Sequence, residues 1–166
     1  MKKLAILGIL ACMAFVPALA QQLESGSLKA LKGEKQVNLK VDFVSIHSMD
    51  EKSFGEYEQD WFKDKPEVLD IIADNANKKL KNMMTLGYSQ KAKYTVTVIV
   101  NSINRKGNYD CDAVITDQES GEIAKITGIK GKGGTFGTKL NLIKDGAGST
   151  GKKVGEILKS ELKKIK

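Results

Sequence analysis

The sequence predicts an α+β domain with a four-stranded, mainly antiparallel sheet and two helices on one face, in the chain order β-α-β-β-β-α. Three observations carry this prediction. Four segments alternate apolar and polar residues with the period of two that is typical of half-buried strands. Two segments repeat apolar residues every three or four positions, as amphipathic helices do. A helix with one apolar stripe must bury it, and one face of the sheet is the available surface.

The N-terminus has the features of a secretory signal peptide. Two lysines stand at its start, residues 4–16 carry no charge, and Ala18-Leu19-Ala20 precedes polar residues. We therefore expect residues 1–20 to be removed, which places the mature protein in the periplasm or outside the cell. One alternative is a retained membrane anchor, although the apolar run is shorter than the roughly 20 residues that span a bilayer. The other is a lipoprotein processed at Cys12, although Leu10 is bulky where a small residue is preferred.

The rest of the chain divides into a polar start and one domain. Residues 21–36 are polar with scattered leucines, and we expect a mobile segment or a short edge element. Residues 37–166 form a single α+β domain, in which no stretch is apolar enough to span a membrane. Its first strand covers residues 37–46. Residues 48–65 show no period but hold four aromatic residues, so we expect a loop or short helical turn that these aromatics clamp to the body.

A helix is expected at about residues 66–86, because apolar residues recur there at helical spacing. Pro66 suits the first position of a helix, and Gly87 suits a left-handed C-terminal cap. Three strand patterns follow, separated by short turns: 94–101, 109–116 and 122–130. The short connections make consecutive strands antiparallel.

Residues 131–151 are rich in glycine, which disfavours a helix. We expect a long loop here, either mobile and functional or packed against the sheet through its glycines. A last amphipathic helix is expected at about 150–165. Within the loop, residues 146–152 match the Gly-x4-Gly-Lys spacing of a phosphate-binding loop. Lys153 stands where that motif needs Ser or Thr for magnesium, so we expect an ordinary connection to the helix.

Composition excludes several chemistries. The net charge is +7, and every basic residue except Arg105 is a lysine. A lysine-rich surface indicates a solvated face with weak attraction for anionic surfaces, whereas nucleic-acid recognition favours arginine, so we expect no nucleic-acid partner. His47 is the only histidine, and Cys111 is the only cysteine after the signal segment, on the apolar side of its strand. We therefore expect a buried Cys111, no metal, no cofactor and no catalytic residues.

Candidate contact residues lie in the glycine-rich region and in the aromatic segment. Glycines leave the backbone free to adapt, and the nearby lysines supply charge, so we expect this region to contact a partner. Trp61 is a further candidate because an exposed Trp favours carbohydrate or peptide contacts, the alternative being a packed core residue. The binding candidates are Lys132, Phe136, Lys139, Lys144, Lys152, Lys153 and Trp61.

Two motifs in the C-terminal third carry a resemblance. They are Gly-Gly-Thr-Phe-Gly at 133–137 and Gly-Lys-Lys-Val-Gly at 151–155, the second opening the expected helix. Together they resemble the pattern of small exported proteins of unknown function from Bacteroidetes-type bacteria. The likeness extends more loosely over residues 37–166. It implies export and no particular activity.

Three functions follow as hypotheses. The first is a non-enzymatic binding or structural domain of the cell envelope, with an envelope protein or polymer as its partner. The second is a carboxylate-dependent hydrolase that uses the His47 region, which requires a pocket bringing His47 near Asp42, Asp110 or Asp112. The third is lysine-mediated binding to an anionic envelope polymer, which salt would weaken.

Overall fold

The computed structural model describes residues 22–88 and 91–165. The predicted signal peptide and the alternative of lipidation at Cys12 lie outside the described residues. Within those residues, no helix has the length and apolar character needed to cross a membrane.

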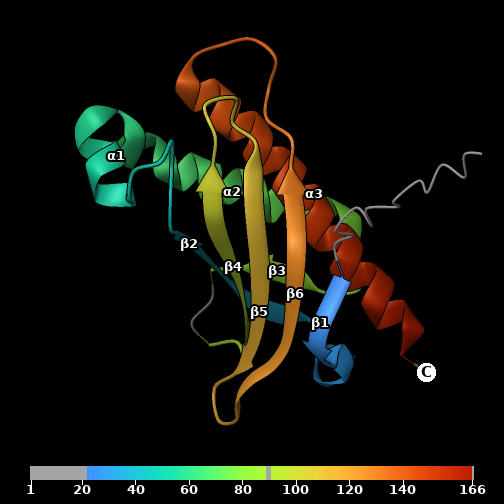
Figure 1. Ribbon diagram of the computed structural model, residues 1–166. Coiled ribbons are helices and arrows are strands. Elements are labelled where there is room, and N and C mark those ends of the chain that lie inside the picture. The colour runs from blue at the N-terminus through green and yellow to red at the C-terminus, as the bar shows by residue number, and fades with distance from the viewer. Residues whose placement is uncertain (1–21, 89–90, 166) are drawn as a thin grey trace, which may run out of the picture.

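The fold is α+β, as predicted, but its sheet is larger than expected (Figure 1). Six strands lie in the order β1-β6-β5-β4-β2-β3, where four were predicted. Their bounds are β1 Gln22–Gly26, β2 Gln36–Phe43, β3 Thr85–Gly87, β4 Tyr94–Ile103, β5 Tyr109–Asp117 and β6 Gly121–Gly131. The three central strands β4, β5 and β6 form the predicted antiparallel meander.

The sheet is mixed because β2 runs parallel to both of its neighbours, β4 and β3. A helical crossover separates β2 from β4, and a crossover returns the chain in its original direction, whereas a short turn reverses it. At the other edge, β1 pairs antiparallel with β6. Residues 22–26, within the N-terminal segment that we expected to be mobile with a short edge element at most, therefore form an edge strand. The short helix η1 (Leu28–Leu31) follows and buries both of its leucines.

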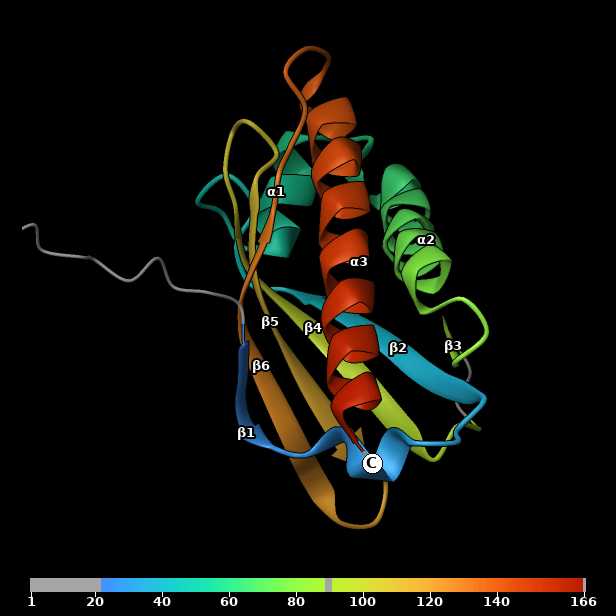
Figure 2. The ribbon, with the colours of Figure 1, turned by 90° about the vertical axis from the view of Figure 1, so that its right-hand side faces the viewer.

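Three α-helices are present where two were predicted: α1 Glu51–Tyr57, α2 Trp61–Leu80 and α3 Lys139–Lys164. Figure 2 shows α2 and α3 side by side on the same side of the sheet. Under them lies the apolar face of the central strands, which includes Val98, Cys111 and Ile115. Cys111 has no exposed surface, so the prediction of its burial is confirmed.

Of the two possibilities expected for residues 48–65, the short helical segment is the one found, as α1, and buried Phe54 and Trp61 attach it to the core. The predicted bounds of the next helix, 66–86, are wrong at both ends. The Asp50 carboxylate caps α1 by accepting a hydrogen bond from the Ser53 amide at 2.8 Å. Helix α2 begins at Trp61, so Pro66 lies inside it. Buried contacts of Trp61 with the Phe43 and Phe54 rings hold this first turn in place.

Helix α2 also ends earlier than predicted, at Leu80, because the chain leaves it to form β3. The Asn77 side chain both donates to the carbonyl of Leu86 and accepts from its amide, at 2.8 Å each. These bonds tie β3 to the last turn of α2. Gly87, predicted as the helix cap, is the last residue of that strand.

The predicted glycine-rich loop over 131–151 is mostly helix, since α3 begins at Lys139 rather than near residue 150. Glycines allow α3 to lie directly against backbone. A methyl group on Gly151 would lie under 3.0 Å from the Ile72 carbonyl oxygen, and one on Gly155 equally close to that of Ala76. The phosphate-loop spacing at 146–152 therefore falls within a continuous helix and forms neither a loop nor a helix N-terminus.

Candidate functional site

Three of the predicted contact residues meet in one groove between α2 and α3. Lys132, Lys144 and Lys152 line it, and it encloses about 600 Å³. Lys144 is already paired with Asp64 at 2.9 Å and Glu67 at 2.7 Å. These two carboxylates raise the pKa of Lys144 through hydrogen bonds and charge. They also neutralise much of the positive charge that the groove would offer to an anion.

The other predicted contact residues are dispersed. Lys153 lies on α3, and its ammonium nitrogen is 3.8 Å from a carboxylate oxygen of Glu156. Phe136 precedes α3 and is 88% exposed. Trp61 is fully buried, and its indole N–H donates to Glu51 at 3.2 Å. Trp61 therefore presents no surface to a partner in this structure and belongs to the core, which is the alternative that the sequence left open.

A second, smaller pocket lies where α1, the β4–β5 turn and the start of α3 meet. It encloses about 280 Å³, and its lining residues are His47, Met49, Tyr57, Arg105 and Lys139. Lys139 is the single predicted contact residue among them. The pocket thus combines two cations, one imidazole, one phenol ring and one thioether.

His47 is placed by a tight turn after β2. Ile46 and Met49 close the turn with two backbone hydrogen bonds of 2.8 and 3.0 Å. His47 and Ser48 at its centre both have positive φ, 52° and 69°, the combination that a type I′ turn requires. The His47 amide also donates to the Ile103 carbonyl at 2.8 Å, which ties the turn to the end of β4.

Arg105 is placed by the β4–β5 turn, which packs on the start of α3. Asn104 closes the turn, its side-chain oxygen accepting from the amides of Lys106 and Asn108 at 2.9 and 3.1 Å. Gly107, with φ of 72°, lies so close to the Leu142 carbonyl that no side chain fits there. The turn therefore reaches the helix without a bulky side chain to hold it away.

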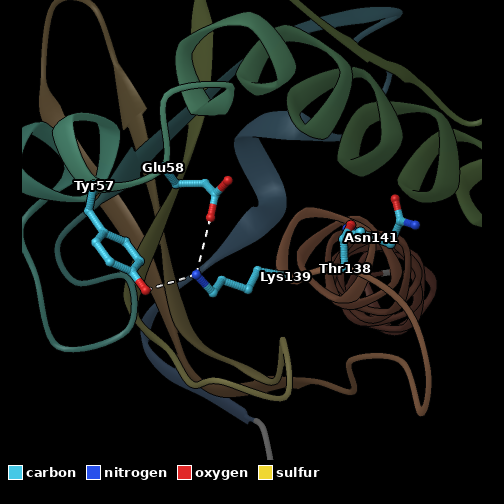
Figure 3. Close-up of polar contacts among 5 residues, drawn as sticks. All are labelled: Tyr57, Glu58, Thr138, Lys139 and Asn141. Atoms are coloured by element: carbon cyan, nitrogen blue, oxygen red, sulfur yellow. Dashed lines mark hydrogen bonds and ion pairs between the residues drawn. The ribbon is translucent and has the colours of Figure 1, made fainter.

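Lys139 opens α3, whose first turn is capped by Thr138 (Figure 3). The Thr138 hydroxyl accepts from the Asn141 amide at 3.2 Å. The Lys139 ammonium donates to the Tyr57 hydroxyl at 2.9 Å and to Glu58 at 3.4 Å, and it lies 4.3 Å from the Tyr57 ring centroid. The hydrogen bond to Tyr57, aided by Glu58, raises the pKa of Lys139.

The environment of His47 disfavours its protonated form. Partial burial, and then the charges of Lys139 and Arg105, lower the pKa of His47, while Asn104 and Glu58 oppose the shift. The Nε2 atom is buried and has no hydrogen-bond partner among the described residues. The ring packs edge-on against Phe54, with centroids 5.2 Å apart.

The carboxylates of the hydrolase hypothesis are engaged elsewhere. Asp42 accepts from Lys40 at 3.1 Å, and Asp110 pairs with Lys130 at 2.6 Å. Asp112 accepts from the Asn101 side chain at 2.9 Å. None of the three lines the His47 pocket. In the part of the chain that the structure describes, no cluster of three or more His, Cys, Asp or Glu residues could hold a metal ion.

No protein-family model matches this chain, and no curated protein matches it. Among solved structures, it is similar to two dodecamers of PelC from Paraburkholderia phytofirmans, one in space group P6 and one a methionine variant in space group C2. Each structure is 14% identical in sequence to this chain and superposes on 84% of it, with a TM-score of 0.48. The matched region covers 96% of the P6 chain and 98% of the C2 chain. These values describe a distant likeness in fold.

Sequence reasoning missed Met49, Tyr57, Glu58 and Arg105 as neighbours of Lys139. These residues come from separate elements, and no spacing in the sequence relates them. One signal was available, because Arg105 is the only arginine in a chain whose other basic residues are lysines. The planar guanidinium of an arginine suits the recognition of a planar anion better than the ammonium of a lysine does.

Proposed function

We propose that this chain is an exported, non-enzymatic domain of the cell envelope that binds a partner through one end of the molecule. We call this surface the α1/α3 end. It comprises Tyr57, Glu58, Asp60, Arg105 and residues 136–140. Export rests on the signal-like N-terminus and agrees with the resemblance to small exported proteins from Bacteroidetes-type bacteria.

The exposed side chain of Phe136 is the observation that carries the proposal. It is 88% exposed on the connection into α3, and Tyr57 is 58% exposed on helix α1, where it contacts Lys139 of α3. Aromatic side chains are enriched in the centres of protein interfaces, because they bury large apolar area with little loss of conformational entropy. Next to each of them in the chain, Glu58, Asp60 and residues 137–140 line a hollow of about 510 Å³, which shares Lys139 with the His47 pocket.

Binding is favoured over hydrolysis because the carboxylates that the hydrolase hypothesis required do not line the His47 pocket, and Glu58, the acidic residue beside it, already pairs with Lys139. General acid–base catalysis needs a titratable group within hydrogen-bond reach of another or of the substrate. The hydrolase hypothesis required Asp42, Asp110 or Asp112 there, and none lines the pocket. Polymer binding through lysines receives less support, because acidic neighbours already pair with Lys144 in the α2–α3 groove.

Affinity capture with matched variants tests the proposal. The mature chain, residues 21–166, is immobilised and exposed to envelope extract. We expect a saturable partner whose retention falls at least fivefold for Phe136→Ala and for Tyr57→Ala. Tyr88→Ala is the control, since Tyr88 is also an exposed aromatic but follows β3 outside the α1/α3 end.

Two results would contradict the proposal. Equal retention by all three variants would place the binding surface elsewhere. Mass spectrometry of the native protein that found an intact or lipidated N-terminus, rather than Gln21, would overturn the processing on which a freely exported domain depends.

A further inference from the structure

We propose that the pocket lined by His47, Met49, Tyr57, Arg105 and Lys139 binds a monocarboxylate no larger than one sugar ring or one amino acid. The inference rests on the proposed function, since it names the ligand class for the same end of the molecule. The carboxylate contacts Arg105 and Lys139, while Tyr57 and Met49 contact the body of the ligand.

The volume of the pocket sets the size of the ligand. It encloses about 280 Å³, at the lower limit of the roughly 300–1,000 Å³ of small-molecule sites. Tyr57 and Met49 give part of the wall an apolar character, as such sites require. A single ring or a short side chain therefore fits, and a longer chain must extend out of the pocket.

The charge balance favours a single negative charge. Arg105 and Lys139 each carry one positive charge, and Glu58 lies 3.4 Å from the Lys139 ammonium. One positive charge thus remains without a counterpart among these three side chains. A monocarboxylate neutralises it, whereas the second charge of a phosphate dianion, the main form of phosphate at about pH 8, would face Glu58 uncompensated.

The unused hydrogen-bond donors suit a carboxylate. Lys139 has three N–H donors and uses two, on Tyr57 and Glu58. No hydrogen bond or ion pair within the described residues engages the Arg105 guanidinium, so its planar fork is available for two parallel bonds. The His47 imidazole also lines the pocket, with its Nε2 atom buried behind the surface.

Proton uptake should accompany binding. The groups facing His47 are Phe54, Tyr57 and Glu58 from the α1 side, Asn104 and Arg105 from the β4–β5 turn, and Lys139 from α3. In the free protein the two cations oppose protonation of His47. A bound carboxylate offsets their charge and so favours the protonated imidazole. Affinity therefore rises as pH falls through the pKa of His47 in the complex, which lies above its pKa in the free protein.

The experiment uses two NMR signals that need no assignment. His47 and Arg105 are the only His and Arg of the chain, so the His Cε1–H and Arg Nε–H resonances are unique. The mature protein is titrated with acetate, D-glucuronate, N-acetylglycine and inorganic phosphate at constant ionic strength. We expect saturable shifts of both signals with the carboxylates, and a higher pKa of His47 when the ligand is bound. Tighter binding of glucuronate than of N-acetylglycine identifies a sugar acid as the ligand, and the reverse order identifies a peptide-like carboxylate.

Matched variants on one turn test the assignment of the site. Arg105→Gln should weaken carboxylate binding about tenfold or more, the usual loss for a hydrogen bond between charged groups. Lys106→Gln removes the same charge from the next residue, which does not line the pocket, and should change affinity less than twofold. Lys139→Met should weaken binding as Arg105→Gln does.

Three outcomes would each overturn the inference. They are shifts that saturate with no carboxylate, tighter binding of phosphate than of acetate, and equal weakening of binding by Arg105→Gln and Lys106→Gln. These outcomes are separable from the proposed function. If partner capture depends on Phe136 but the protein binds no carboxylate in the titration, the inference fails and the proposed function stands. Carboxylate binding without partner capture refutes the proposed partner-binding function.

Discussion

The close packing of α3 on α2 predicts opposite effects for one substitution at two glycines of the same helix. Gly148 and Gly151 both lie inside α3. A methyl group on Gly148 would meet only the side chains of Asn75 and Ile71, at 3.6 Å, which is ordinary contact. On Gly151 it would lie under 3.0 Å from the backbone carbonyl oxygen of Ile72, which cannot rotate away.

The magnitudes follow from this geometry. Ala is favoured over Gly in a helix interior by about 1 kcal/mol, so Gly148→Ala should stabilise the fold by roughly that amount. Ordinary contact begins at 3.4 Å, so Gly151→Ala must separate the helices by more than about 0.4 Å. Overpacking against fixed backbone costs about 3 kcal/mol, so after the helix-propensity gain Gly151→Ala should destabilise the fold by about 2 kcal/mol.

Urea unfolding of the mature chain measures both effects. The free energies of unfolding of the two variants should differ by about 3 kcal/mol, with opposite signs relative to the parent and unchanged m-values. Gly155→Ala should resemble Gly151→Ala, since its methyl group would meet the Ala76 carbonyl. Stabilisation by Gly151→Ala as large as that by Gly148→Ala would refute the direct contact of α3 with the α2 backbone.

Three further predictions concern single residues. Burial raises the pKa of the Cys111 thiol, so a thiol reagent should label the native mature protein slowly and the denatured protein rapidly. Rapid labelling of the native protein would mean that the register of this strand is wrong. The pKa of folded His47 lies below 6.5, so its contribution to stability is present above pH 6.5 and is lost as pH falls through the folded pKa. His47→Asn should reduce this part of the pH dependence of the unfolding free energy. Parallel curves of unfolding free energy against pH for parent and variant would contradict it. Ser48→Gly should stabilise the fold by about 0.5 kcal/mol in thermal unfolding, because Gly adopts the positive φ of 69° without the strain of a Cβ, and a loss of stability would argue against the left-handed turn.

The sequence by itself determined the central meander and the existence of its two long helices. In β4, β5 and β6 the alternation of apolar and polar residues depends only on the pleat, which is local, and it placed Cys111 in the core correctly. Short turns between these strands then left no choice but antiparallel pairing. The helical spacing of apolar residues likewise identified most of α2 and the second half of α3.

The tertiary structure alone decided the element boundaries and the site. Glycine in isolation disfavours a helix, yet Gly151 is helical because its lack of a side chain lets α3 contact the Ile72 carbonyl. The sequence left Trp61 open between an exposed contact residue and a packed core residue, and the packing of Phe43 and Phe54 against it decided for the core. The pocket follows the same logic, since His47, Arg105 and Lys139 lie on a turn after β2, the β4–β5 turn and α3, and only the packing of those elements brings them together. Local periodicity reports which face of an element is buried, and it carries no information about which elements meet at their ends.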